Sequence, residues 1–175
     1  MKHIISDRSR VILQNKDHLE KSLNIKITNK GKVIIIDGIA EDEYLAERVI
    51  HAINFSFPID AALILKDEEN IFHIINIKDI SKSSNLARVR GRIIGTERKT
   101  LDNIENLTKC ILVLKDNKIG IIGYNEDVEN AIRALTSLVK GSKTANVYSY
   151  LEKHHSQPIL DLGLKPAKKK TTTFK

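Results

Sequence analysis

The side chains with the clearest chemistry lie in one arginine-rich stretch, residues 82–99. It carries six basic residues and a single acid, Glu97, and it holds four of the eight arginines in the chain. Arginine presents a rigid fork of N–H donors that matches the oxygens of a phosphate group. With a local charge of +5, the stretch indicates phosphate binding. The alternative is a charged surface that contacts only solvent.

Gly95 divides this stretch just before a helix expected over Lys99–Lys109. Glycine lets a phosphate approach the main chain, and the N–H groups that begin a helix point outward toward anions. A short helix, a glycine turn and a second helix, flanked by arginine, therefore predict a site for a sugar–phosphate backbone. A strand expected after the second helix forms the other wall. The candidate residues of the site are Arg88, Arg90, Gly91, Arg92, Ile93, Ile94, Gly95, Thr96, Arg98, Lys99, Ile111 and Leu112.

The elements that position this site occur twice in the chain. In the first half, β-rich runs at 25–28 and 32–38 precede a helix expected over 41–54. In the second half, runs at 110–114 and 118–124 precede a helix expected over 125–140. Apolar residues recur at helical spacing in both helices, and a further apolar-striped helix precedes each pair of runs. A repeat near 85 residues is too long for a solenoid, so two tandem domains are expected; chance similarity is the alternative.

Each copy reads strand, helix, turn, helix, strand, strand, helix. That order predicts an α+β protein with two tandem type I KH domains, each a three-stranded antiparallel sheet with three helices, followed by a C-terminal helix. The expected divisions are a degenerate KH domain over 1–56, a structured connector over 57–82, a KH domain with the C-terminal helix over 83–155 and a disordered basic tail over 156–175. A KH domain clamps the backbone of about four nucleotides at its glycine turn.

The chain resembles the archaeal ribosomal-RNA-processing KH proteins, relatives of the eukaryotic small-subunit assembly factor called partner of Nob. The resemblance covers roughly residues 1–155, and its most specific parts are Gly91-Arg-Ile-Ile-Gly95, Lys99-Thr100 and residues 117–123 and 147–152. It implies binding of single-stranded RNA near the 3′ end of small-subunit ribosomal RNA. It also implies cooperation with the endonuclease that matures that end and association with the alpha subunit of archaeal initiation factor two.

The turn departs from the family pattern at one position. A full KH turn is Gly-x-x-Gly, whereas Gly95-Thr-Glu-Arg98 has arginine at the second glycine and an acid before it. Binding weaker than that of a complete turn is expected, with Arg98 contacting phosphate through its side chain. The corresponding place in the first copy, residues 13–16, has no glycine, so that copy is expected to be a scaffold.

Composition argues against other classes of protein. Five of the lysines lie in the last eleven residues, so the other 164 residues carry a net charge of only +2. The lone Cys110 excludes an internal disulfide and suits a cytoplasmic protein, and no apolar run approaches the ~20 residues of a membrane span. No nucleotide-binding motif or catalytic triad is present, so neither enzyme activity nor a cofactor or metal is expected. The competing function is a protein–protein adaptor in ribosome or translation-initiation assembly, with an incidental basic patch.

Overall fold

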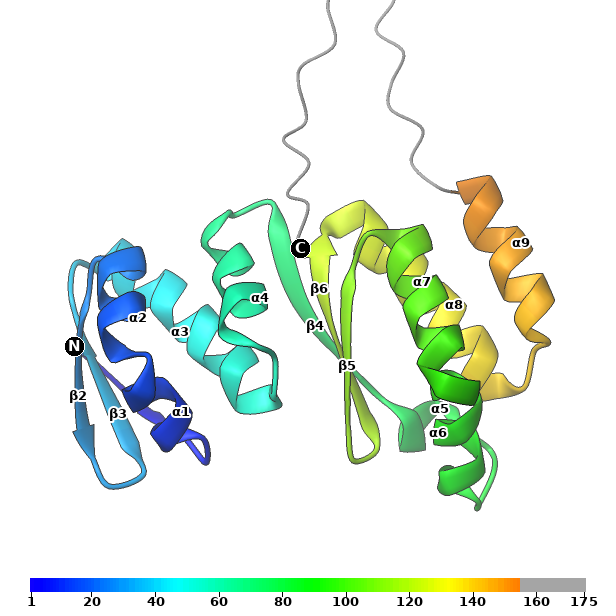
Figure 1. Ribbon diagram of the computed structural model, residues 1–175, viewed down its shortest axis with the longest axis horizontal. Helices are drawn as coiled ribbons and strands as arrows, with labels where there is room; N and C mark the ends of the chain where they lie inside the picture. The colour runs from blue at the N-terminus through cyan, green and yellow to red at the C-terminus, as the bar shows by residue number, and fades with distance from the viewer. Residues whose placement is uncertain (155–175) are drawn as a thin grey trace, which may run out of the picture.

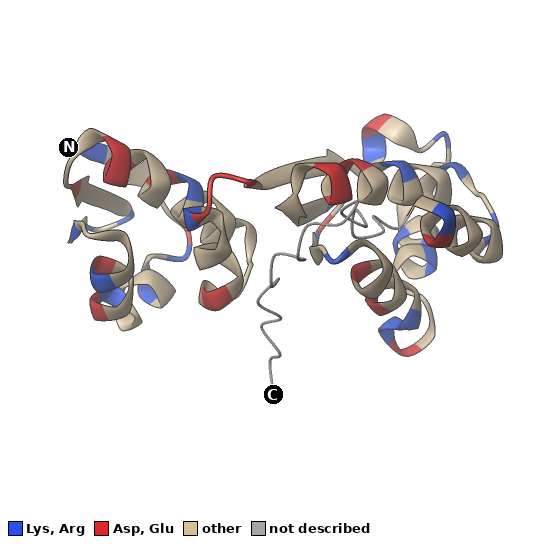
Figure 2. Cartoon of the chain, turned by 90° about the horizontal axis from the view of Figure 1, so that it is seen from above, with Lys and Arg blue, Asp and Glu red and all other residues tan. Residues whose placement is uncertain are grey.

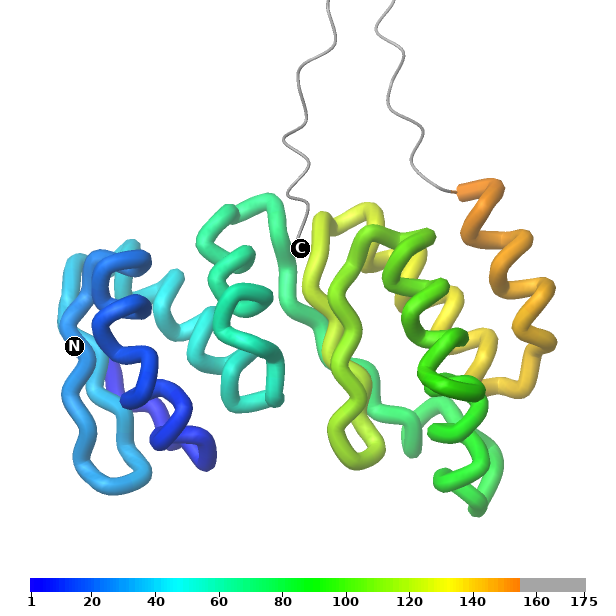
Figure 3. The backbone as a smooth tube through the Cα atoms, in the orientation of Figure 1, coloured from blue at the N-terminus to red at the C-terminus, as the bar shows by residue number. Residues whose placement is uncertain are grey.

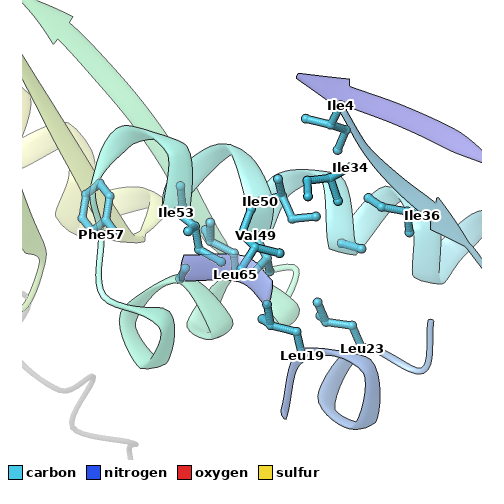
Figure 4. Close-up of a cluster of buried hydrophobic side chains, with 14 of the residues drawn as sticks. Ile4, Leu19, Leu23, Ile34, Ile36, Val49, Ile50, Ile53, Phe57 and Leu65 are labelled. Carbon is cyan, nitrogen blue, oxygen red and sulfur yellow. The ribbon is translucent and has the colours of Figure 1, made fainter. Parts of the chain in front are cut away.

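The computed structural model describes residues 1–154, and its first α+β unit lies at the N-terminus. The strands of this unit form an antiparallel sheet in the order β1-β3-β2, with helices on one face (Figure 1). Figure 4 shows isoleucines of the sheet, such as Ile34 and Ile36, pointing toward Val49 and Ile50 of the longest helix. The elements are β1 (Lys2–Ile5), α1 (Ser9–Gln14), α2 (Lys16–Leu23), β2 (Lys26–Lys30), β3 (Val33–Asp37) and α3 (Ala40–Phe55).

The second unit repeats this order and adds a C-terminal helix. Its antiparallel sheet has the order β4-β6-β5, so the two three-stranded antiparallel sheets expected from the sequence are confirmed. The expected disordered tail, 156–175, lies outside the described residues. The unit contains β4 (Asn70–Asn76), α5 (Ile77–Ile80), α6 (Leu86–Ile94), η2 (Thr96–Arg98), α7 (Lys99–Thr108), β5 (Ile111–Lys115), β6 (Lys118–Tyr124), α8 (Asn125–Lys140) and α9 (Thr144–His154); α4 (Ile59–Leu63) and η1 (Ile64–Lys66) precede it.

Equivalent hydrogen bonds, one in each unit, show how closely the two units correspond. In the first unit, the carboxylate of Glu20 on α2 accepts from the backbone N–H of Ile27 on β2 at 2.6 Å. In the second unit, the carboxylate of Glu105 on α7 accepts from the N–H of Leu112 on β5 at 2.7 Å. Each counterpart lies 85 positions further along the chain. The helix before the hairpin is thus fastened to the edge strand in the same way in both units.

The first unit packs its C-terminal end against the second sheet, as the neighbouring tubes in Figure 3 show. Phe55 and Phe57 meet Phe72 of β4 with ring centroids 5.8 and 5.6 Å away. The rings lie over Gly120 of β6, where an added Cβ would stand 2.6 Å from both Phe55 and Phe57. The central strand β6 is therefore covered on both faces, and this explains why it reads as a nearly continuous apolar run.

The segment expected as a connector, 57–82, is divided between the two units. Phe57, Ala62 and Leu65 are fully buried in the first core. Residues 70–76 instead form β4, which pairs with β6 along its whole length. The expected start of the second unit at residue 83 therefore needs correction, because it leaves out one of the three strands. The acidic turn before β4 is the red loop between the units in Figure 2.

Candidate nucleic-acid interface

The turn between α6 and α7 has a backbone that requires glycine at its first position. Gly95 has φ +73°, a backbone conformation that residues other than glycine rarely adopt. A Cβ there would stand 2.2 Å from Oγ1 and 2.9 Å from the backbone nitrogen of Thr100, in the first turn of α7. The absence of a side chain lets the chain fold back closely on the start of α7. The expected helix, glycine turn and second helix are all present.

The missing second glycine is replaced by a residue that adopts the conformation glycine usually takes. Arg98 has φ +65°, and the preceding Glu97 also has a positive φ. The Arg98 guanidinium donates to the Asp102 carboxylate at 2.6 Å and to Glu105 at 3.1 Å. The hydrogen bond to Asp102 raises the pKa of Arg98 above its ordinary value. These ion pairs offset the strain of a left-handed residue, which costs about 1–2 kcal/mol.

The same contacts limit what Arg98 offers to a phosphate. Two carboxylates already occupy its fork, and Glu105 is itself held by the Leu112 amide. Lys99 lies 3.0 Å from Glu97 in an exposed ion pair that solvent screens strongly. Asp102 lies at the i, i+4 spacing from Arg98 that favours an ion pair, a signal that the sequence analysis did not use, whereas the pair with Glu105 has no such spacing.

Helix α6 presents small and apolar residues on an exposed face that borders the turn. Gly91 is exposed, and an added Cβ would meet no atom within 4 Å. Ala87 and Ile94 are exposed and fall on the same side of a helix with 100° per residue. Beside this face, the Arg90 guanidinium donates to the backbone oxygen of Asp116, in the β5–β6 turn, at 3.2 Å. Arg90 thus joins α6 to the hairpin that contains β5.

Not all of the candidate residues lie on this face. Ile93 is fully buried in the core of the second unit. Arg88 and Arg92 lie one helical turn apart on another flank of α6, where they line a pocket with the end of α8. The sequence pattern predicts one site for all these residues because they are close along the chain. A helix, however, distributes neighbouring residues around its axis.

Strand β5 can contact a ligand only through its backbone edge, because the side chains of Ile111 and Leu112, predicted to make contacts, point elsewhere. Leu112 is buried beneath the helices, and Ile111 packs against the core of the first unit. Because β5 is an edge strand, alternate backbone groups point away from β6. Glu105 occupies the outward amide of Leu112, so the next outward groups are those of Leu114. The outward backbone groups of Leu114 therefore lie on the edge strand that α7 joins through Glu105.

Cys110 lies in the core beneath this site and is unsuited to act as a nucleophile. Burial raises the pKa of its thiol to about 12. We expect the folded protein to resist a disulfide reagent at pH 8, because the reactive thiolate is scarce and shielded. The same reagent should label the protein fully in guanidinium chloride, a control that uses the single cysteine as its own reference. Rapid labelling of folded protein would contradict the buried position.

Among residues 1–154, no group of three or more histidine, cysteine, aspartate or glutamate side chains could hold a metal ion. The His154 ring stacks on the Tyr150 ring with centroids 4.2 Å apart, and its Nδ1 lies 2.8 Å from the backbone oxygen of Tyr150. Within the same residues, no helix is long and apolar enough to cross a membrane.

An α6–turn–α7 motif packed on an antiparallel sheet of order β4-β6-β5 defines a KH domain of the eukaryotic type. A family model for the second KH domain of PNO1, described as a eukaryotic-type KH domain (KH-domain type I), matches residues 71–156. KH domain-containing protein MJ0443 of Methanocaldococcus jannaschii is 31% identical over 165 residues, which cover 88% of this chain and 73% of that protein. The chain belongs to the PNO1 family of KH-domain proteins, as the resemblance implied.

Two further relatives have informative names. Pre-rRNA-processing protein pno1 of Aspergillus fumigatus is 29% identical over 144 residues, which cover 78% of this chain but only 57% of that protein. A chain in the crystal structure of an a/eIF2alpha–aDim2p–rRNA complex from Pyrococcus horikoshii is 29% identical, with a TM-score of 0.78. The match covers 88% of this chain and 93% of that chain.

Proposed function

We propose that this protein is a non-catalytic, cytoplasmic binder of single-stranded RNA that acts near the 3′ end of small-subunit ribosomal RNA during ribosome maturation. The observation that carries the proposal is the glycine turn at Gly95, which packs closely on the start of α7, the helix that Glu105 joins to the edge strand β5. The name of the Aspergillus relative and the rRNA in the Pyrococcus complex support it.

The proposed binding groove lies between α6, the Gly95 turn and the edge of β5. Phosphates approach the open backbone of the turn, and Lys99 and Arg90 supply positive charge beside it. Bases lie over Gly91 and Ile94, where their edges reach the backbone groups of Leu114 on β5. The strand edge accepts and donates hydrogen bonds, so the bases can be bound without an aromatic side chain to stack on. The groove then holds about four nucleotides.

The first unit serves as a scaffold in this proposal, although it is the other half of a tandem pair of KH domains. Only Asn15 separates α1 from α2, whereas four residues separate α6 from α7. With no glycine and no extended turn, the first unit offers no comparable approach to its backbone. The endonuclease of 3′-end maturation and the alpha subunit of initiation factor two are the proposed protein partners.

A protein–protein adaptor is the second candidate function, and a cavity between the units favours it. The cavity measures about 1250 Å³ and lies between α3 and the second sheet. Exposed Tyr44 and Ile74 line it together with Lys115 and Lys118. Apolar side chains ringed by charge are typical of surfaces that bind another protein.

Polarisation titration with a short unstructured RNA separates the two functions. We expect the full chain to bind the single strand more tightly than a duplex of the same sequence, since only unpaired bases can enter the groove. With about three phosphates neutralised, the logarithm of the affinity should fall with the logarithm of salt concentration at a slope near −2. Equal affinity for strand and duplex would contradict the groove, and no binding to either would favour the adaptor.

A further inference from the structure

Two arginines of α6 point away from the proposed groove into a second basic site. Arg88 and Arg92 lie four positions apart and share one flank of the helix. Arg90, about 160° from Arg92 around the axis, instead reaches the β5–β6 turn. The two flanks of one short helix therefore carry positive charge into different surroundings.

The site on the Arg88 and Arg92 flank is a pocket of about 670 Å³, here called the rear pocket. It lies where the segment before α6 meets the C-terminal end of α8. Four of its lining residues are basic and none is acidic. Within residues 1–154, no carboxylate lies within 4.0 Å of any of the four cationic groups. The lining residues are Ile80, Ser81, Lys82, Ser83, Arg88, Val89, Arg92, Val139 and Lys140.

The contrast with the glycine turn shows why this charge pattern is informative. At the turn, Arg98 and Lys99 are each paired with a carboxylate. In the rear pocket, four like charges converge without such a partner, and a concave basic surface concentrates anions. Self-repulsion among these side chains is relieved when a polyanion binds, so the pocket favours one.

Hydroxyl groups and a helix end complete the arrangement. Ser81 accepts from the Ser83 amide at 3.1 Å, and Ser83 accepts from the Asn85 amide at 3.2 Å. Each hydroxyl keeps its proton to donate to a phosphate oxygen. Arg92 lies beside the C-terminus of α8, with Nη1 3.3 Å from the position of a Cβ on Gly141. The negative end of a helix dipole favours a cation at this position.

We propose that the rear pocket binds phosphates of the RNA strand that flanks the segment held in the groove. This inference rests on the proposed function, because it takes the groove-bound RNA as its starting point. The groove and the rear pocket lie on two sides of the same helix, whose diameter is about 10–12 Å. The nucleotides next to the groove-bound segment span that distance, because they belong to the same strand. The guanidinium groups of Arg88 and Arg92, one helical turn apart, bind the phosphates of these nucleotides. The contact adds affinity without reading sequence.

The test uses the Arg88→Gln/Arg92→Gln double variant and two unstructured RNAs, one of about five nucleotides and one of about fifteen. The short RNA fills only the groove, whereas the long RNA reaches both sites. We expect the variant to bind the short RNA as the wild type does, which also shows that it is folded. For the long RNA, the salt slope should fall by about 1.4 for two lost contacts, with an affinity loss of roughly tenfold at low salt.

Arg10→Gln/Arg133→Gln is the matched control, because it removes two exposed arginines that lie outside the pocket. Equal losses in both double variants would overturn the proposal, since only net charge would then matter. Equal losses on both RNAs would place the two arginines in the groove, and an unaltered long-RNA affinity would exclude the pocket. If the wild-type protein bound the long RNA but not the short RNA, that result would contradict the proposed groove but not the rear pocket. Binding of neither RNA would overturn both.

Discussion

Replacement of Gly95 by aspartate is expected to lower the affinity for short single-stranded RNA on the order of a hundredfold, equivalent to about 2.7 kcal/mol. The first cause is steric: an added Cβ would stand 2.9 Å from the backbone nitrogen of Thr100, and no side-chain rotation relieves that contact. A positive φ at Gly95 adds strain for any side chain. The second cause is a negative charge where phosphate approaches. Fluorescence polarisation measures the loss.

Substitutions at the adjacent Thr96 separate charge from strain. Thr96 is exposed, and its φ is negative, so aspartate fits there without distortion. Thr96→Asp should weaken binding about tenfold while the melting temperature stays near that of the wild type. Thr96→Asn, which has nearly the same shape without the charge, is the control and should bind much more tightly than the aspartate variant. Wild-type affinity in a folded Gly95→Asp variant would mean that RNA binds elsewhere.

The glycine turn can be predicted from the sequence because its signals are local. Gly95, the arginines around it and the apolar stripe of the following helix all lie within a few turns of one another. The direction of Arg88 and Arg92 cannot be read in this way, because it depends on how α6 packs on α8. The paired contacts of Arg98 with Asp102 and Glu105 cannot be predicted in the same way, because they depend on a left-handed backbone that a sequence pattern does not specify.

The division of the chain shows the same limit at a larger scale. The repeated order of strands and helices was readable because apolar spacing records which face of each element is buried. The sequence pattern does not separate the strand at 70–76 from a connector, because its partner, β6, lies more than 40 residues away. Its pairing with β6 and the packing of its Phe72 against Phe55 and Phe57 all join residues that are distant in the sequence. Local propensity carries no information about such contacts.

That contact between units predicts the second large effect, destabilisation by Gly120→Ala. Local propensity favours the opposite result, because glycine weakens a strand interior. In the folded protein, however, the new Cβ would stand 2.6 Å from the rings of Phe55 and Phe57, which are buried. Overpacking of this kind costs about 1–3 kcal/mol. Urea unfolding should therefore show a lower midpoint for Gly120→Ala than for the wild type.

Two further variants decide whether the aromatic contact is the cause. Gly91→Ala is the matched control, because its Cβ meets nothing within 4 Å and helix propensity alone should raise stability by about 0.5–1 kcal/mol. Phe55→Leu shortens one of the rings over Gly120. It should cost less in the Gly120→Ala background than in the wild type, since the clash and the ring are removed together. A Gly120→Ala protein as stable as the wild type would show that the first unit does not rest on β6, and a purely additive double variant would assign the loss to some other contact.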